Sequence, residues 1–169
     1  MNKQPGKEEF LRLIHDNSGI IFKVCNAYCI TVQDREDLAQ EIIYNLWKSI
    51  RSFDNSYKFS TWMYRVALNV AISFYRKESK SMPIVSLSEH ATEIEDKTTE
   101  QQKTEEKSRL LQQFISELKP LERALMLLYI DGKSYTEIAE ILGITETNTA
   151  TKISRIKNNL RQKVLGVNK

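Results

Sequence analysis

The sequence predicts an all-α protein made of two small helical domains joined by a flexible linker. Long segments repeat apolar residues every three or four positions, and no stretch sustains the apolar–polar alternation of a half-buried strand. Glycine and proline are scarce, with five and three among 169 residues, so few positions interrupt a helix. The 41% of hydrophobic and 28% of charged residues are typical of a globular protein.

Composition divides the chain into a first helical domain at 1–76, an acidic linker at 77–108 and a second helical domain at 109–169. The middle segment carries eight acidic and five basic side chains and is nearly free of aromatic residues, so it cannot bury enough apolar surface to fold alone. The helices of the first domain are expected at 7–30, 34–51 and 60–76. Those of the second are expected at 109–118, 121–131, 135–142 and 146–163.

Basic residues gather at the C-terminal end of the chain. The net charge is only +3, but residues 149–169 carry six basic side chains and no acidic one. A cationic segment behind an acidic linker suits a polyanionic partner such as nucleic acid. The alternative is a solvated helix face, because helix C-termini also favour lysine and arginine.

Membrane, secreted and metal-binding classes do not fit the sequence. No apolar run reaches the roughly 20 residues that cross a membrane, and the first ten residues lack the apolar core of a signal peptide, so a cytoplasmic protein without membrane insertion is expected. Cys25 and Cys29 would need further ligands to hold a metal, and the only histidines are His15 and His90. The cysteines are interpreted as buried small hydrophobic residues in a reducing compartment. No cofactor is expected.

The segment "SYTEIAEILGIT" at 134–145 encodes a short helix with its own start and stop signals. Ser134 and Glu137 have the spacing of a capping box, and Gly143 can adopt the left-handed backbone that ends a helix. A second helix follows in "ETNTATKISRIKNNLRQK". Two helices across a tight turn form the unit that many proteins place in the DNA major groove. A helical hairpin used only for protein packing is the alternative.

The last helix has two distinct faces. An apolar stripe is expected to pack against the preceding helices: Thr149, Ile153, Ile156, Leu160 and Val164. A rotation of about 100° per residue gathers base-edge and phosphate donors on another face near the helix N-terminus. They are Asn148, Thr151, Lys152 and Arg155. We expect this face to read duplex DNA.

An aromatic segment of the first domain, "FDNSYKFSTWMYRVALNVAISFYRK" at 53–77, predicts a different surface. Its helix is expected to be capped by Ser60 or Thr61 and to bury Trp62, Met63, Val66, Ala67, Val70 and Phe74. Its far side presents Arg65, Asn69 and Arg76, and the loop before it adds Phe53, Tyr57 and Phe59. Arginines can hold a nucleic-acid backbone, rings can stack on bases and an amide can read a base edge, so this surface suits a single strand.

The segment "DREDLAQEIIYNLWKSI" at 34–50 predicts an amphipathic helix. Its inward face is expected to contain Leu38, Ile42, Leu46 and Ile50, with Trp47 alongside. Carboxylates and an amide crowd one end: Asp34, Glu36, Asp37, Gln40 and Glu41. They either complement the helix dipole or form a docking patch for a basic partner protein, and the residues alone leave both readings open.

Together these motifs resemble a bacterial sigma factor of the extracytoplasmic-function (ECF) group of the sigma-70 family. "DREDLAQEIIYNLW" is similar to the helix with which that family grips the β′ clamp helices of core RNA polymerase. "FSTWMYRVALN" is similar to its promoter-melting helix, and "DGKSYTEIAEILGIT" with "TKISRIKNNLR" to its region-four helix-turn-helix. The motifs stand in the family's order and cover nearly all of the chain except the tip and the linker.

The resemblance implies a transcription initiation factor with divided labour. Region 2, in the first domain, would bind core RNA polymerase and capture an unpaired base of the −10 promoter element, with Asn69 as the pocket amide and Phe53 at its edge. Region 4 would read the −35 element of promoter DNA as duplex. Lys152, Arg155 and Lys157 keep the positive sites of a reading helix whose start, "TNTATK", departs from the usual "GTVRSR". The linker would thread towards the RNA exit path, and an anti-sigma factor is a further partner that the resemblance suggests.

Two other classes of function make different predictions. A stand-alone helix-turn-helix transcription regulator would bind duplex DNA without polymerase, and it gives no role to "DREDLAQE" or to Asn69 between arginines. An enzyme would need a phosphate-binding glycine loop, a metal cluster or a nucleophile elbow, and the sequence has none of these. We therefore expect no catalytic activity, and RNA synthesis would belong to the polymerase.

Overall fold

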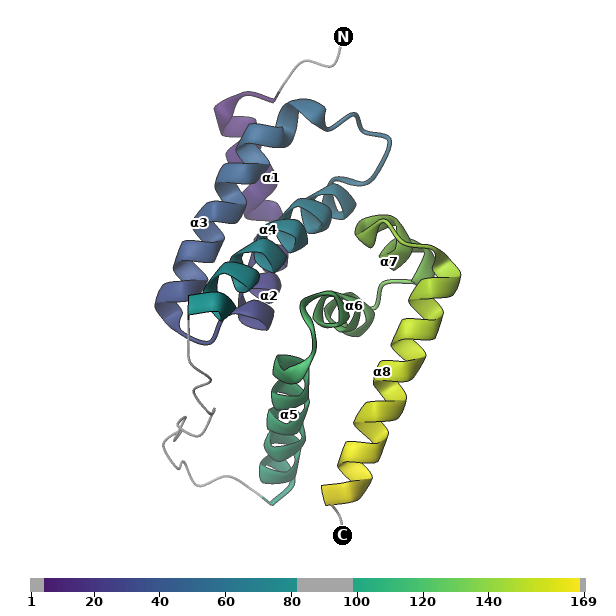
Figure 1. The fold of residues 1–169 in the computed structure, drawn as a ribbon. Helices are drawn as coiled ribbons and strands as arrows, with labels where there is room; N and C mark the ends of the chain where they lie inside the picture. Colours follow the sequence, from purple (N-terminus) through teal and green to yellow (C-terminus); the bar gives the residue numbers. More distant parts are fainter. Residues whose placement is uncertain (1–4, 82–98, 168–169) are drawn as a thin grey trace.

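The computed structural model describes residues 5–81 and 99–167, which are almost entirely helical (Figure 1). Their elements are α1 (Lys7–Asp16), α2 (Ser18–Tyr28), α3 (Val32–Ser49), the 3-10 turn η1 (Ile50–Ser52), α4 (Phe59–Ser81), α5 (Thr99–Glu117), α6 (Pro120–Ile130), α7 (Tyr135–Leu142) and α8 (Glu146–Val167). These two stretches contain no strand. The predicted all-helical class is confirmed.

The first four helices pack around an apolar centre. α2, α3 and α4 contact one another, and α1 packs on α2 (Figure 1). Leu38, Ile42 and Leu46 have no exposed surface, and Ile50 is 2% exposed, so the predicted inward face of α3 is confirmed. Each such side chain contributes roughly 1.5–3 kcal/mol by its burial. This stripe fixes the helix whose outer face carries the acidic residues.

The helix expected at 7–30 is interrupted at Asn17, where α1 and α2 meet. The side-chain amide of Asn17 donates to the carbonyl oxygen of Leu13 at 2.9 Å. Such local bonds compete with the backbone bonds that continue a helix. The prediction of one continuous helix was therefore wrong, although Phe10 and Ile14 of α1 are still buried against the bundle.

The second half of the chain contains α5 to α8, and α7 and α8 form the predicted helix-turn-helix. The backbone N–H of Glu137 donates to the hydroxyl of Ser134 at 3.1 Å, and the backbone N–H of Ser134 donates to a Glu137 carboxylate oxygen at 2.8 Å. Gly143 has a φ of 67°, in the left-handed region. The capping box and the glycine stop are confirmed, and α8 then runs along the outside of the domain (Figure 1).

Helices extend into both ends of the segment expected as a linker at 77–108. α4 continues to Ser81 and α5 begins at Thr99. Residues 82–98 lie outside the described part of the chain. The division into two domains and a linker at the predicted boundaries stays a prediction.

Replacing Ser134 by alanine is expected to destabilise the second domain by about 1 kcal/mol, because the N-cap hydroxyl of α7 is lost. Chemical denaturation followed by circular dichroism measures the change. Ser154→Ala, at an exposed position of α8, is the matched control and should have almost no effect. Equal stability of the Ser134→Ala variant and the control would show that the cap does not hold α7.

Candidate nucleic-acid interface

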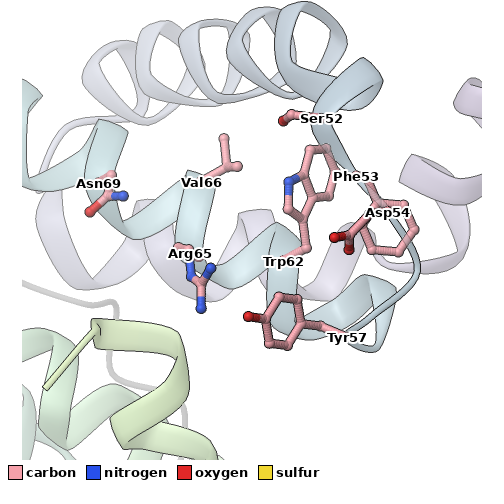
Figure 2. A pocket seen from close by; sticks show the side chains of 8 residues that line it. All are labelled: Ser52, Phe53, Asp54, Tyr57, Trp62, Arg65, Val66 and Asn69. Atoms are coloured by element: carbon pink, nitrogen blue, oxygen red, sulfur yellow. The ribbon is translucent and has the colours of Figure 1, made fainter. Parts of the chain in front are cut away.

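A hollow of about 260 Å³ lies between the first turns of α4 and the loop before that helix (Figure 2). Its lining comes from one continuous segment: Ser52, Phe53, Asp54, Tyr57, Trp62, Arg65, Val66 and Asn69. Asn69 and Trp62 lie at opposite ends of the hollow, with Val66 between them (Figure 2). The structure thus gathers rings, a cation and an amide around one small space, and four of the six residues predicted for the single-strand surface are among them.

Local hydrogen bonds shape the loop before α4. A carboxylate oxygen of Asp54 accepts from the hydroxyl of Ser56 at 2.5 Å and from its backbone N–H at 3.0 Å, and these bonds hold the pKa of the Asp54 carboxyl below its ordinary value. Asn55 has a φ of 60°, a left-handed conformation that asparagine tolerates. After this turn the ring of Tyr57 meets Arg65, whose guanidinium carbon lies 5.1 Å from the ring centre.

Phe53, Phe59 and Trp62 form an aromatic cluster with ring centres 5.3 to 5.6 Å apart. Phe59 is half-buried and contacts the ring of Phe53, but it is not among the residues that line the hollow. Trp62 is 8% exposed, as expected of a core residue, yet its side chain also lines the hollow. α4 begins at Phe59, so Ser60 and Thr61 lie inside its first turn and the predicted cap was wrong.

α4 is covered on more sides than its sequence pattern predicted. Tyr64 and Leu68 are each 1% exposed, although the expected apolar stripe did not include them. They are buried because α6 and α7 pack on α4 in addition to α2 and α3. Arg76 is exposed on the C-terminal half of α4 and is not among the residues that line the hollow.

The first turns of α8 present the predicted duplex-reading face. Asn148, Thr151 and Arg155 are exposed, and Lys152 is half-buried. The hydroxyl of Thr145 accepts from the backbone N–H of Asn148 at 3.1 Å. This cap orders the helix N-terminus, whose positive dipole end favours an anion such as a phosphate.

The predicted core stripe of α8 is confirmed over its first half: Thr149 and Ile153 have no exposed surface and Ile156 is 3% exposed. Val164 is 42% exposed, so its assignment to the core was wrong. Near that end, the contact between α8 and α5 is made by Lys163, which forms an ion pair with Glu117 and lies over the ring of Phe114.

Lys157 lies apart from the other predicted duplex-binding residues. It is about 180° around the helix from Asn148, on the far side of the buried stripe. Its Nζ donates to the hydroxyl of Tyr129 at 3.1 Å, and this bond raises the pKa of the lysine. The structure therefore places four of the five predicted residues on one face and Lys157 on another.

The outer face of α3 carries the predicted acidic patch. Glu36, Asp37 and Gln40 are exposed, while Asp34 and Glu41 are half-buried. Only Asp34 lies in the first helical turn, and the helix dipole acts on little beyond that turn. The dipole therefore accounts for Asp34 alone, and Asp37 accepts instead from the side-chain amide of Gln33 at 3.1 Å.

Two aromatic residues on the same helix were missed or misplaced by sequence reasoning. Tyr44 is 62% exposed and Trp47 is 41% exposed, whereas Trp47 was expected beside the core. Trp47 packs on Phe10 of α1 in an edge-to-face arrangement, with ring centres 4.9 Å apart, and is still partly open to solvent. The spacing of four and three residues from Gln40 through Tyr44 to Trp47 was the signal that could have placed them beside the acidic patch.

Comparison with known proteins gives the chain its family. Family models of sigma-70 region 2 and sigma-70 region 4 match residues 13–81 and 108–160. The chain is 30% identical to the ECF RNA polymerase sigma factor SigW of Bacillus subtilis (strain 168), over 96% of this chain and 92% of that protein. The chain belongs to the sigma-70 family, in its ECF group. This sigma factor is also 26% identical to the ECF RNA polymerase sigma-E factor of Haemophilus influenzae, over 96% and 90% of the two chains.

Solved structures share the fold of this sigma factor. CnrH, in complex with the cytosolic domain of CnrY, has a TM-score of 0.66 at 18% identity and covers 95% of this chain and 90% of its own. The sigma factor RpoE of Bartonella quintana, in complex with the anti-sigma factor NepR, has a TM-score of 0.62 at 20% identity and covers 96% and 98%. At this level of identity the likeness is one of fold.

Other predicted features of the sigma factor concern metals, membranes and thiols. Over residues 5–81 and 99–167, no cluster of three or more side chains could hold a metal ion, and none of the described helices is both long and apolar enough to span a bilayer. Cys25 and Cys29 are free and buried, which confirms their interpretation as core residues. Burial raises the pKa of the Cys25 thiol to about 11 and that of Cys29 to about 12, so neither is a ready nucleophile.

Proposed function

We propose that this sigma factor binds bacterial core RNA polymerase and directs it to specific promoters, with three of its surfaces each taking one part of the task. Similarity to ECF sigma factors along nearly the whole chain supports this role, and no comparison supports a stand-alone regulator. The observation that carries the proposal is the hollow at α4, which combines stacking rings, an arginine and an amide. Such a protein would act in the cytoplasm, and RNA synthesis would be catalysed by the polymerase.

The hollow at α4 would receive one unpaired base of the −10 element. Extruding a base from a duplex costs a few kcal/mol. Stacking on an aromatic ring contributes roughly 1–3 kcal/mol per base, and Tyr57 or Phe53 can supply that ring. The amide of Asn69 can donate and accept at a base edge, while Arg65 holds the backbone. These terms are similar in size to the cost of extrusion, so the pocket can stabilise a melted strand.

The exposed face of α8 would read the −35 element as duplex. Asn148 and Arg155 carry the amide and guanidinium groups that recognise adenine and guanine edges in the major groove. Lys152 and Thr151 can contact phosphates. Lys157, on another side of α8, would reach only the DNA backbone outside the groove.

The outer face of α3 would dock on the β′ clamp helices of core polymerase. Asp37 and Glu36 supply negative charge, while Tyr44 and Trp47 supply exposed rings. Aromatic anchors surrounded by polar residues are typical of the energetically important part of a protein interface. The exposed rings beside the carboxylates therefore favour a docking surface over a patch that only complements the helix dipole. A sigma factor in complex with an anti-sigma factor, as for RpoE with NepR, makes an anti-sigma protein a further partner that we propose.

Replacing Arg155 by alanine is expected to cost roughly 1–3 kcal/mol of −35 binding if the guanidinium reads a base. The loss would then be confined to promoters with the matching base pair. If Arg155 instead contacts a phosphate, its replacement should lower the affinity for all −35 sequences equally and make binding less dependent on salt. Affinities of the holoenzyme for a panel of −35 duplexes measure the difference, with Arg161→Ala as the control of equal charge. Equal affinities for the two variants would mean that α8 meets DNA in another orientation.

The function is tested by reconstitution of the purified chain with core RNA polymerase, followed by sequencing of the transcripts' 5′ ends. We expect start sites that share sequence elements near −10 and −35 and that are absent with core polymerase alone. A protein that binds its DNA site tightly by itself and leaves the start sites of the polymerase unchanged would be a stand-alone regulator.

A further inference from the structure

The docking face proposed for α3 is a stripe of exposed side chains along one side of the helix. Its members recur every three or four residues and so share that side: Asp37, Gln40, Tyr44 and Trp47. Exposed side chains sample several conformations, and a partner that immobilises one of them loses part of the binding energy. A face whose side chains are fixed beforehand therefore binds more tightly than a mobile face with the same residues.

Trp47, at the C-terminal end of the docking face, is held by a residue of α1, which lies beside α3 (Figure 1). The indole meets the ring of Phe10 edge to face, with an interplanar angle of 66° and ring centres 4.9 Å apart. Phe10 is 3% exposed, whereas Trp47 is 41% exposed. The core therefore fixes the phenyl ring, and the phenyl ring supports the indole. An edge-to-face pair contributes roughly two- to tenfold in an equilibrium constant.

The N-terminal end of the docking face is fixed by Arg35. Its guanidinium donates to the side-chain oxygen of Asn26 in α2 at 2.8 Å. It also donates to the carbonyl oxygens of Ile30 at 3.0 Å and Thr31 at 3.3 Å, in the turn between α2 and α3. The planar guanidinium holds its donors in a fixed fork, which the ammonium group of lysine lacks. Arg35 therefore ties the first turn of α3, two residues before Asp37, to the preceding helix.

We propose that Phe10 and Arg35 are positioning residues of the docking face, which fix its two ends before core polymerase binds. Phe10 is buried, and the guanidinium of Arg35 donates to oxygen atoms of its own chain, so each acts on a partner through the residues that it holds. The inference rests on the proposed function, since that function assigns the face to polymerase. A substitution of either residue should lower the affinity for polymerase although every residue of the docking face is kept.

A double-mutant cycle tests the support of Trp47. Phe10→Leu removes the phenyl ring and keeps a buried apolar side chain. Binding to immobilised core polymerase should weaken about two- to tenfold, which is the cost of ordering one side chain on binding. The same replacement should have almost no effect in a Trp47→Ala background, because the indole that it positions is gone. An equal loss in both backgrounds would be a general structural effect and would overturn the role of Phe10.

The matched control cycle uses Tyr44, which lies on the same face but is 62% exposed. In the described part of the chain its ring contacts no other aromatic ring. Phe10→Leu should therefore weaken binding by the same factor in the Tyr44→Ala background as in the wild type, since independent effects add. Coupling of Phe10 to Tyr44 as strong as its coupling to Trp47 would contradict a support that is specific to the indole.

The state of the indole can be measured in the free protein. The chain has two tryptophans, so fluorotryptophan labelling gives two fluorine NMR signals, which the Trp47→Phe variant assigns. Phe10→Leu should shift the Trp47 signal toward that of a mobile indole and leave the Trp62 signal in place, which would show that the bundle is intact. A Trp47 signal that does not change would overturn the positioning role, however large the loss of binding.

The other end of the docking face is tested by Arg35→Lys, which keeps the positive charge and loses the fork. The affinity for core polymerase should fall about two- to tenfold, because the start of α3 becomes mobile and must be ordered on binding. Arg12→Lys makes the same replacement at an exposed position of α1 and should bind as the wild type does. Equal affinities for the two variants would overturn the role of Arg35.

Failure of the inference differs from failure of the proposed function. If Asp37→Lys lowers the affinity for core polymerase but Phe10→Leu and Arg35→Lys do not, α3 is the docking surface and the positioning inference is overturned. If Asp37→Lys does not lower the affinity of a protein that binds polymerase, the proposed docking surface itself is refuted.

Discussion

Replacing Asn69 by alanine should leave holoenzyme formation intact and slow promoter opening by about ten- to a hundredfold. The amide lies at one end of the α4 hollow (Figure 2), and its removal takes away the group that can pair with a base edge. A base-edge contact contributes roughly 1–3 kcal/mol, and each 1.4 kcal/mol changes a rate about tenfold. The backbone of α4 and its core face are untouched, so the fold should be unchanged.

Permanganate reactivity of thymines in the −10 region measures this effect. The Asn69→Ala holoenzyme should show weak reactivity on a promoter that it still binds through the −35 element. Ser73→Ala, one turn further along α4 at an exposed position outside the hollow, should behave as the wild type. If the thymines are as reactive with the Asn69→Ala holoenzyme as with the wild type, the amide has no part in strand capture.

Reversing the charge of Asp37 should weaken binding to core polymerase by about a hundredfold. Lysine at this exposed position of α3 places like charge against a basic partner surface, and such juxtapositions cost several kcal/mol. The buried stripe of Leu38, Ile42 and Leu46 on the other side of α3 is unaffected. Thermal unfolding should therefore be close to that of the wild type.

Surface plasmon resonance with immobilised core polymerase measures the loss. Asp16→Lys is the matched control, because it makes the same charge change at an exposed position at the end of α1. If the two variants bind polymerase equally well, the acidic patch of α3 is not the docking surface.

The parts of the fold that the sequence predicted are those fixed by local chemistry. The capping box of Ser134 and Glu137 and the stop at Gly143 depend on residues within one short segment, and all three are confirmed. The inward face of α3 follows from a regular apolar spacing that needs no knowledge of its neighbours. Asn17 was missed because a single amide decides between continuing a helix and ending it.

The parts that the sequence did not predict depend on contacts between distant elements. Tyr64 lies outside the apolar stripe of α4, and it is buried because α6 and α7 pack there. Arg123 looks like an ordinary polar position of a helix, yet it is 3% exposed. The carbonyl oxygens of Ala27 and Ser116 accept from its guanidinium, and the ring of Tyr75 lies against it. Nothing in the local pattern distinguishes a solvated arginine from one that joins two domains.

The candidate site could likewise be predicted only where it depends on local sequence. Asn69, Arg65 and Phe53 were predicted from residue types and spacing that suit strand binding, and the structure brings them to one hollow. Trp62 was assigned to the core alone, since a buried ring that also lines a hollow requires knowledge of the loop that folds over it. The rotation of about 100° per residue already places Lys157 on a different face from Asn148. Lys157 was nevertheless predicted to bind duplex DNA, because it matches a positive position of the family motif.

The two surfaces of this sigma factor are expected to recognise DNA in opposite strand states, and fork-junction templates measure this directly. With core polymerase present, a template with a duplex −35 element and a single-stranded −10 element should bind at least tenfold more tightly than the fully duplex promoter, and Asn69→Ala should abolish the difference. Equal affinity for the two templates, or tighter binding when the −35 element is the single-stranded one, would contradict the division of labour between α4 and α8.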